Sequence, residues 1–161
     1  GSPMHPAYGA GHATVAGACV TILKAFFDTS AVLVKTKEDE KLFRRYKSGD
    51  EPLVFRAPTL PDLEKGEDLP ADYLDATRLL VESKPDQFLT LEGELNKLAA
   101  NISIGRNMAG VHYFTDYYDS LRMGEAIAIG MLEEQALTYS TDPFVLSVPT
   151  FDGDVVRIGR R

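Results

Sequence analysis

The hydrophobic positions along the chain predict three helices. Residues 13–27 read ATVAGACVTILKAFF and carry apolar side chains on nearly every face of a helix, which predicts a helix buried on most sides. Residues 91–104 place apolar side chains at spacings of three and four, the helical period. A third, longer helix is predicted over residues 117–139, and its final turns are amphipathic. Gly105 and Gly110 predict a bend between the second and third helices.

The stretch between the first two helices has a different character. Residues 31–35 are compatible with a strand or with irregular structure. Charged residues and prolines dominate residues 36–85, which predicts mostly loop with short helices, for example over 38–46 and 73–81. A loop-rich stretch of this length is unusual inside a domain unless it covers a site or a partner.

The C-terminal end reads FVLSVPTFDGDVVRI, residues 144–158, which predicts two short strands joined around Asp152-Gly153 as a β-hairpin. A length of 161 residues fits one domain with an ordinary core, so residues 1–161 are predicted to form a single domain. The predicted fold class is mainly α, a partial helical bundle with a small C-terminal β-hairpin.

Charge, hydropathy and the cysteine count exclude several classes of function and structure. The net charge is −7, which argues against a general nucleic-acid surface, because such a surface needs clustered Lys and Arg. No apolar run is long enough to predict a membrane span. Cys19 is the single cysteine, so no intrachain disulfide can form, and its apolar surroundings predict a buried thiol.

The histidines and their neighbours are the candidate catalytic or ligand-binding residues. The chain has three, His5, His12 and His112. Arg106 precedes His112 by six residues and Asp116 follows it by four. A carboxylate four residues away on a helix can hold one imidazole nitrogen and leave the other free as a nucleophile or ligand. An arginine close by suits an oxyanion, because its donors match phosphate-like oxygens.

A second candidate region lies at the start of the first helix. The Gly9-Ala10-Gly11 turn leaves free backbone N–H groups at the helix N-terminus, so the Gly11 N–H is a candidate anion donor. His12 follows directly and could act as an acid or base there. A few converging donors can bind an anion despite the negative net charge.

Together these segments resemble the vanadium-dependent haloperoxidases and the wider superfamily with the type 2 phosphatidic acid phosphatases and bacterial acid phosphatases. The family motifs are a Ser-Gly-His turn that opens a helix and an Arg followed by Gly-x-His-x-x-x-Asp. Here they read Ala10-Gly11-His12 and Arg106, then GVHYFTD over residues 110–116. The stretches GSPMHPAYGAGHAT, LEGELNKLAANISIGRNMAGVHY and FVLSVPTFDGDVVRI are similar to algal-type bromoperoxidases. The resemblance is weak across residues 36–85.

The resemblance implies a helical bundle of the haloperoxidase and acid phosphatase type, with an anion site between helices that holds vanadate. It implies that a ring nitrogen of His112 bonds vanadium and that Asp116 orients the other nitrogen. It further implies that Arg106 pairs with vanadate oxygens and that Gly11 donates its backbone N–H to them.

The activity implied is oxidation of bromide by hydrogen peroxide to hypobromous acid or an equivalent, which then reaches small organic acceptors. His12 would be the acid–base group for hydrogen peroxide. His5 matches a further histidine of the bromoperoxidases that lies near the site and tunes halide use.

Two departures from the family pattern matter. Ala10 stands where the family has a serine, so one hydroxyl hydrogen bond to the oxyanion is lost. The family's Lys-x6-Arg-Pro segment, which supplies two more cations, does not occur in this sequence. The simplest explanation is that the chain is the C-terminal part of a larger haloperoxidase. We therefore expect the isolated chain to bind vanadate weakly or not at all, and we expect a partial bundle with exposed apolar surface to form a homo-oligomer.

Two other functions remain open at this point. The first is a phosphomonoesterase of the same superfamily, in which His112 forms a phosphohistidine and His12 protonates the leaving alcohol. Phosphate and vanadate have similar shape and charge, so one pocket can serve both. The second is a degenerate, non-catalytic helical scaffold, favoured by Ala10 and by the missing cationic segment.

Overall fold

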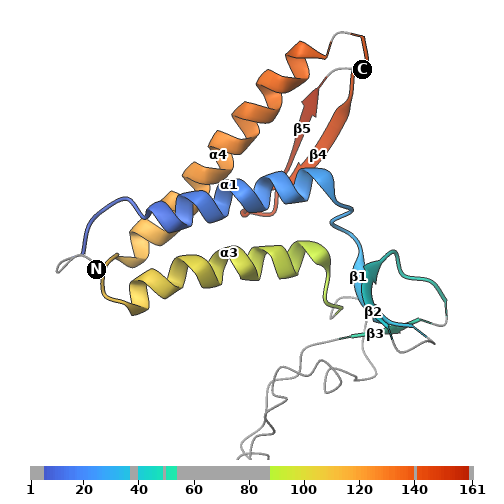
Figure 1. Cartoon of the computed structure of the whole chain (residues 1–161), viewed down its shortest axis with the longest axis horizontal. Coiled ribbons are helices and arrows are strands. Elements are labelled where there is room, and N and C mark those ends of the chain that lie inside the picture. The colour runs from blue at the N-terminus through green and yellow to red at the C-terminus, as the bar shows by residue number, and fades with distance from the viewer. Residues whose placement is uncertain (1–5, 37–39, 49, 54–87, 140, 160–161) are drawn as a thin grey trace, which may run out of the picture. The chain divides into compact units, whose positions relative to one another are not determined.

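The computed structural model describes residues 6–36, 40–48, 50–53, 88–139 and 141–159. The chain divides into two compact units, one made of Gly1–Thr29 with Glu92–Arg161 and the other of Ser30–Leu91. The first unit contains the long helices and a two-stranded hairpin, and the second contains a small antiparallel sheet (Figure 1). The predicted fold class, mainly α with a small C-terminal β-hairpin, is confirmed.

The helices are α1, Gly11–Phe26; α3, Leu91–Met108; and α4, Phe114–Thr138. All three were predicted, and their observed bounds differ by a few residues. The bend predicted at Gly105 is wrong, because α3 continues through this residue. Glycine weakens a helix without ending it unless the backbone leaves the helical region. That happens at Gly110, whose φ of +71° is left-handed and whose N–H donates to the Asn107 carbonyl.

Helices α1 and α4 pack at very short range because glycines lie where they cross. A Cβ added at Gly17 would lie 2.1 Å from the Leu121 carbonyl oxygen, and one added at Gly124 would lie 2.0 Å from that of Thr14. Next to this crossing, Ala16 and Val20 of α1 pack against Leu121 of α4 and Ala99 of α3. The small residues of the α1 sequence therefore allow backbone-to-backbone packing.

The C-terminal hairpin is formed by β4, Val145–Pro149, and β5, Val155–Gly159, which pair antiparallel as predicted. Its turn contains Gly153, whose φ is +88°. Val148 and Ile158 are fully buried and form a second apolar cluster with Leu132 of α4.

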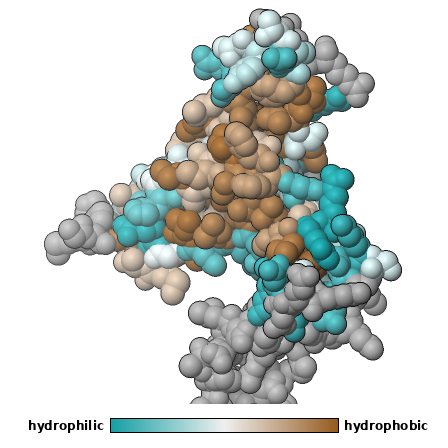
Figure 2. Space-filling view, turned by 45° about the vertical axis from the view of Figure 1, so that its right-hand side comes forward, coloured by the Kyte–Doolittle hydropathy of each residue, from teal (hydrophilic) through white to brown (hydrophobic). Residues whose placement is uncertain are grey.

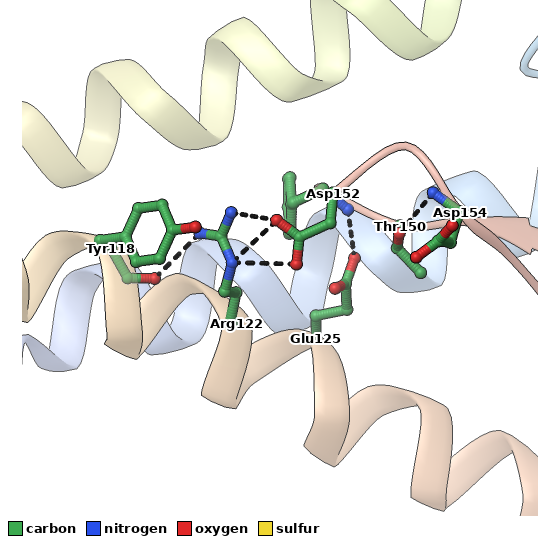
Figure 3. Close-up of polar contacts among 7 residues, drawn as sticks. Tyr118, Arg122, Glu125, Thr150, Asp152 and Asp154 are labelled. Atoms are coloured by element: carbon green, nitrogen blue, oxygen red, sulfur yellow. Dashed lines mark hydrogen bonds and ion pairs between the residues drawn. The ribbon is translucent and has the colours of Figure 1, made fainter.

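The turn of this hairpin is held to α4 by polar side chains (Figure 3). Arg122 forms an ion pair with Asp152, and its guanidinium lies 3.4 Å from the Tyr118 ring centroid. Glu125, one turn further along α4, accepts a hydrogen bond of 2.8 Å from the Phe151 N–H. These contacts hold the turn of the hairpin against α4.

Lys24 of α1 also contacts the hairpin, next to its turn. Its side chain is 1% exposed, its Nζ donates to the Pro149 carbonyl at 3.1 Å, and it lies 4.0 Å from the Phe151 ring centroid. Burial lowers the pKa of Lys24, while the nearby Glu125 and Glu92 carboxylates act to raise it. A buried cation is thus matched by a carbonyl, an aromatic face and two carboxylates.

The second unit contains a three-stranded sheet in the order β2-β1-β3, formed by Val32–Lys35, Lys41–Arg44 and Glu51–Pro52 as β1, β2 and β3. The strand alternative for residues 31–35 is therefore correct. The helix predicted over 38–46 is wrong where the structure describes it, because Lys41–Arg44 pairs with β1. Pairing with a neighbouring strand outweighed the helical propensity of a charged segment. The helix predicted over 73–81 lies outside the described residues.

Candidate functional site

The first described residues run along the start of α4, which brings two distant parts of the sequence together. The Ala7 N–H donates to the Val111 carbonyl at 3.0 Å. The Ala7 carbonyl oxygen in turn lies 2.7 Å from Nδ1 of His112, which is 105 residues away in the sequence. The segment before α1 is therefore anchored next to the segment that contains His112.

The contact with the Ala7 carbonyl determines the tautomer of the His112 ring. A backbone carbonyl can only accept a hydrogen bond, so Nδ1 must carry the proton and donate it. The neutral ring then has its lone pair on Nε2, and no residue within the described ranges hydrogen-bonds that atom. The side chain is 11% exposed. His112 can therefore act as a nitrogen ligand or as a nucleophile through Nε2.

Asp116 lies beside the same ring nitrogen at a longer distance. Its Oδ2 is 3.5 Å from His112 Nδ1 and accepts a hydrogen bond of 3.0 Å from the Tyr113 N–H, at the start of α4. The side chain is fully buried. Asp116 thus caps the helix and places a carboxylate near the imidazole, but the Ala7 carbonyl is the closer partner. A backbone carbonyl leaves no mark in the sequence, so sequence reasoning missed it.

The N-terminus of α1 offers backbone donors. Ala10 is the N-cap, it is fully buried, and no side chain of its own caps the helix. In the part of the chain that the structure describes, the N–H groups of Gly11, His12 and Ala13 have no acceptor, and the first turn contains no acidic residue. Gly11 and His12 are exposed. This helix end can therefore accept an anion from solvent.

Arg106 lies in the last turn of α3 and is half-buried. Its carbonyl accepts the Val111 N–H at 3.3 Å, so its backbone is tied to the loop that leads to His112. Its Nε is buried and has no hydrogen-bond partner among the described residues. A buried guanidinium donor without an acceptor is the kind of group that an oxyanion would satisfy.

Not every predicted residue is linked by a contact. Within the described ranges, no hydrogen bond or ion pair joins the side chain of His12 or Arg106 to His112. His5 lies outside the described residues. Sequence reasoning also missed Ser120, whose Oγ accepts a hydrogen bond of 2.9 Å from the Ala10 N–H. Its spacing of four from Asp116, which itself follows His112 by four, was the available signal.

The His112 ring, the Arg106 guanidinium and the start of α1 supply groups of the chemical kinds that bind a tetrahedral oxyanion. One imidazole nitrogen with a free lone pair, one guanidinium donor without a partner and a row of free backbone N–H groups match a single ligand bond and several hydrogen bonds. A metal ion held directly by protein needs a different set, and within the described ranges no three His, Cys, Asp or Glu side chains come together in that way. None of the described helices is long and apolar enough to cross a membrane.

Comparisons with known proteins identify the family of the chain. Residues 1–139 match the family described as the VCPO second helical-bundle domain. The chain is 46% identical over 158 residues to a vanadium-dependent bromoperoxidase of Corallina officinalis and 48% identical to that of Corallina pilulifera, with 98% of this chain covered in each case. It is 31% identical over the same length to the vanadium-dependent bromoperoxidase of Ascophyllum nodosum.

The chain spans about a fifth of the length of these curated relatives, 21% for both Corallina proteins. The family match covers both motifs, from the turn before α1 to the end of α4. The similarity to the bromoperoxidases extends over nearly the whole chain. The chain therefore belongs to the family of the VCPO second helical-bundle domain and is related to the vanadium-dependent bromoperoxidases.

Proposed function

We propose that this chain is the C-terminal part of a larger vanadium-dependent bromoperoxidase and supplies part of its vanadate site. The reaction proposed is oxidation of bromide by hydrogen peroxide to hypobromous acid or an equivalent, which small organic acceptors then consume. The observation that carries the proposal is the contact between the Ala7 carbonyl and the His112 ring. The Ala7 carbonyl engages Nδ1 at 2.7 Å, which leaves Nε2 available as a ligand beside the segment that leads into α1.

Each residue would contribute through a group already described. His112 would hold the vanadium through Nε2, with Asp116 as a second partner of its Nδ1. The unpartnered Arg106 Nε and the Gly11 N–H would balance the negative charge of the oxyanion. Bound vanadate would supply Lewis-acid activation of hydrogen peroxide.

His12 is proposed to move protons at this site. It is exposed on the first turn of α1, next to the free N–H groups, where a substrate oxygen could exchange a proton with its ring. His5 is proposed to tune halide use, as the family resemblance implies.

The chain alone is expected to bind vanadate weakly or not at all. The sequence lacks the Lys-x6-Arg-Pro segment, so two cations that the resembling family uses are missing from it. Ala10 also lacks the hydroxyl of the family's serine. With fewer donors, more of the anion's charge stays uncompensated, and the complex is weaker.

Vanadium-51 NMR titration of the 161-residue chain tests this proposal, together with a bromide oxidation assay with hydrogen peroxide. We expect weak binding that His112→Ala abolishes, and only slow bromide oxidation. Ala10→Ser is expected to tighten binding by about tenfold or more, because a hydrogen bond to a charged group contributes about 1.5–3 kcal/mol. Ala16→Ser, a buried position further along α1, is the matched control and should leave binding unchanged.

Other results would contradict the proposal. Robust bromide oxidation by the isolated chain would show that the missing cations are not needed. Hydrolysis of p-nitrophenyl phosphate that depends on His112, without bromide oxidation, would identify a phosphomonoesterase. Vanadate binding that survives His112→Ala would place the anion elsewhere.

We also propose that the chain forms a homo-oligomer through the outer face of α1. Val15, Cys19 and Phe26 are exposed at helical spacing along this face, with Val15 63% and Phe26 78% exposed. Figure 2 shows hydrophobic side chains gathered in the middle of the face in view, with hydrophilic side chains above and beside them. Exposed apolar surface of this kind favours association in water.

A further inference from the structure

Ser120 is a buried polar residue whose contact connects the two parts of the candidate site. It lies on α4, its side chain is almost fully buried, and its Oγ accepts the Ala10 N–H at 2.9 Å. Ala10 is the N-cap of α1. The bond therefore joins α4 to the residue that precedes α1, the helix whose first N–H groups are the candidate anion donors.

The chain has no local substitute for this bond. In a capping box the N-cap N–H is accepted by a Glu or Gln side chain at the third helical position. That position is occupied by Ala13, which has no acceptor. Without the Ser120 hydroxyl, the fully buried Ala10 N–H would have no partner among the described residues. Ser120 satisfies only this donor, so the N–H groups of Gly11 and His12 stay available for a ligand.

The same short segment is held at both ends. At Ala7 its carbonyl accepts from His112 Nδ1, and three residues later its Ala10 N–H donates to Ser120. Both partners belong to the region that leads into and forms the start of α4. The exposed Tyr8 hydroxyl adds a bond of 2.8 Å to Asp119 on the same helix. Two buried or half-buried contacts therefore fix the first turn of α1 with respect to the His112 ring.

We propose that Ser120 is a positioning residue of the oxyanion site, which holds the N-terminus of α1 against α4 so that the Gly11 N–H and His112 Nε2 serve one anion. This inference rests on the proposed function for the identity of the anion, vanadate. The positioning itself concerns the ligand-free chain and can be measured without any ligand.

Ser120→Ala is the test, with Ser103→Ala as the matched control. Ser103 is equally buried, and its hydroxyl bonds only to the Ala99 carbonyl of its own helix. In ligand-free chain at equal temperature, we expect the Ala10 amide to exchange its hydrogen at least tenfold faster in Ser120→Ala than in wild type. We also expect nitrogen-15 NMR to show a smaller fraction of His112 protonated on Nδ1. Ser103→Ala should change neither signal, and Ser120→Thr, which retains the hydroxyl, should restore both.

A titration with orthovanadate separates this inference from the proposed function. If positioning is correct, the vanadate-induced shift of the Gly11 amide in wild type is reduced at least fivefold in Ser120→Ala. If wild type shows no such shift while the ligand-free effects are present, the isolated chain does not bind vanadate through Gly11, and the positioning role stands on the ligand-free measurements. Unchanged Ala10 exchange and an unchanged His112 signal in a folded Ser120→Ala variant would overturn the inference. Circular dichroism establishes whether each variant is folded.

Discussion

At the scale of single residues, a backbone carbonyl makes the decisive contact of the candidate site. Asp116 was predicted to orient His112 from their spacing of four, and it does lie 3.5 Å from Nδ1. The Ala7 carbonyl lies closer, at 2.7 Å, and also forces the proton onto Nδ1. Spacing on one helix can be read from a sequence, whereas a contact made across 105 residues depends on how the helices pack.

Glu125 gives a pH prediction at the same scale. Burial raises the pKa of the Glu125 carboxyl, while the Phe151 N–H and Lys24 act to lower it. The folded state therefore binds this proton more tightly than the unfolded chain, whose pKa is near 4.5. Between 4.5 and the raised value, the free energy of unfolding must fall as pH rises. Glu125→Gln keeps an oxygen for the Phe151 N–H and should lose this pH dependence.

Urea unfolding of wild type and Glu125→Gln across the acidic range measures the effect. Asp152, whose pKa Arg122 lowers, contributes a slope of the opposite sign below 3.8 in both proteins, so the difference between the two curves isolates Glu125. Glu133→Gln, an exposed position on the same helix, is the control and should follow wild type. Parallel curves for wild type and Glu125→Gln would contradict the prediction.

At the scale of elements, the crossing of α1 and α4 is the feature on which the site depends. Gly17 and Gly124 allow the two backbones to touch, and this packing brings the Ala10 N–H within reach of Ser120. Inside a helix, alanine is normally more stable than glycine. Here the order should be reversed, because the added Cβ would meet a carbonyl oxygen at 2.0–2.1 Å.

We predict that Gly124→Ala lowers the free energy of unfolding by about 1–3 kcal/mol, because the helices must separate. Gly130→Ala is the matched control on the same helix, where an added Cβ meets nothing within 4 Å. That variant should be more stable than wild type by about 0.5–1 kcal/mol. Chemical denaturation of the two variants and of wild type measures both free-energy differences. A stabilised Gly124→Ala variant would show that the helices do not cross as closely as described.

At the scale of the whole molecule, α1 is less covered than its sequence predicted. Its all-round apolar character predicted burial on most sides, and the thiol of Cys19 was expected to be buried. In the structure α3, α4 and the hairpin cover part of the helix, and Cys19 is exposed together with Val15 and Phe26. The prediction of burial for Cys19 is therefore wrong for this chain on its own, and the exposed face is the basis of the proposed oligomer.

Sedimentation velocity tests the oligomer. We expect wild type to sediment as a species heavier than the 17.7 kDa chain, and Val15→Glu or Phe26→Glu to shift it toward the monomer. Val155→Glu is the control. Val155 is as exposed as Val15, at 65%, but it belongs to β5 and not to the face of α1 proposed as the interface. A wild-type monomer at all concentrations, or an equal shift with Val155→Glu, would contradict the proposed interface.

The amino-acid sequence by itself determined the three helices, the C-terminal hairpin and the residue types of the candidate site. Helical periodicity, the Asp152-Gly153 turn and the histidine motifs are local patterns, and local patterns can be read along one chain. Tertiary structure decided the strand at Lys41–Arg44 and the exposure of Cys19. It also decided the Ala7–His112 contact and the hydrogen bond from the Ala10 N–H to Ser120. Each depends on which distant segment lies alongside, and pairing, burial and backbone hydrogen bonds between such segments are set only when the elements pack.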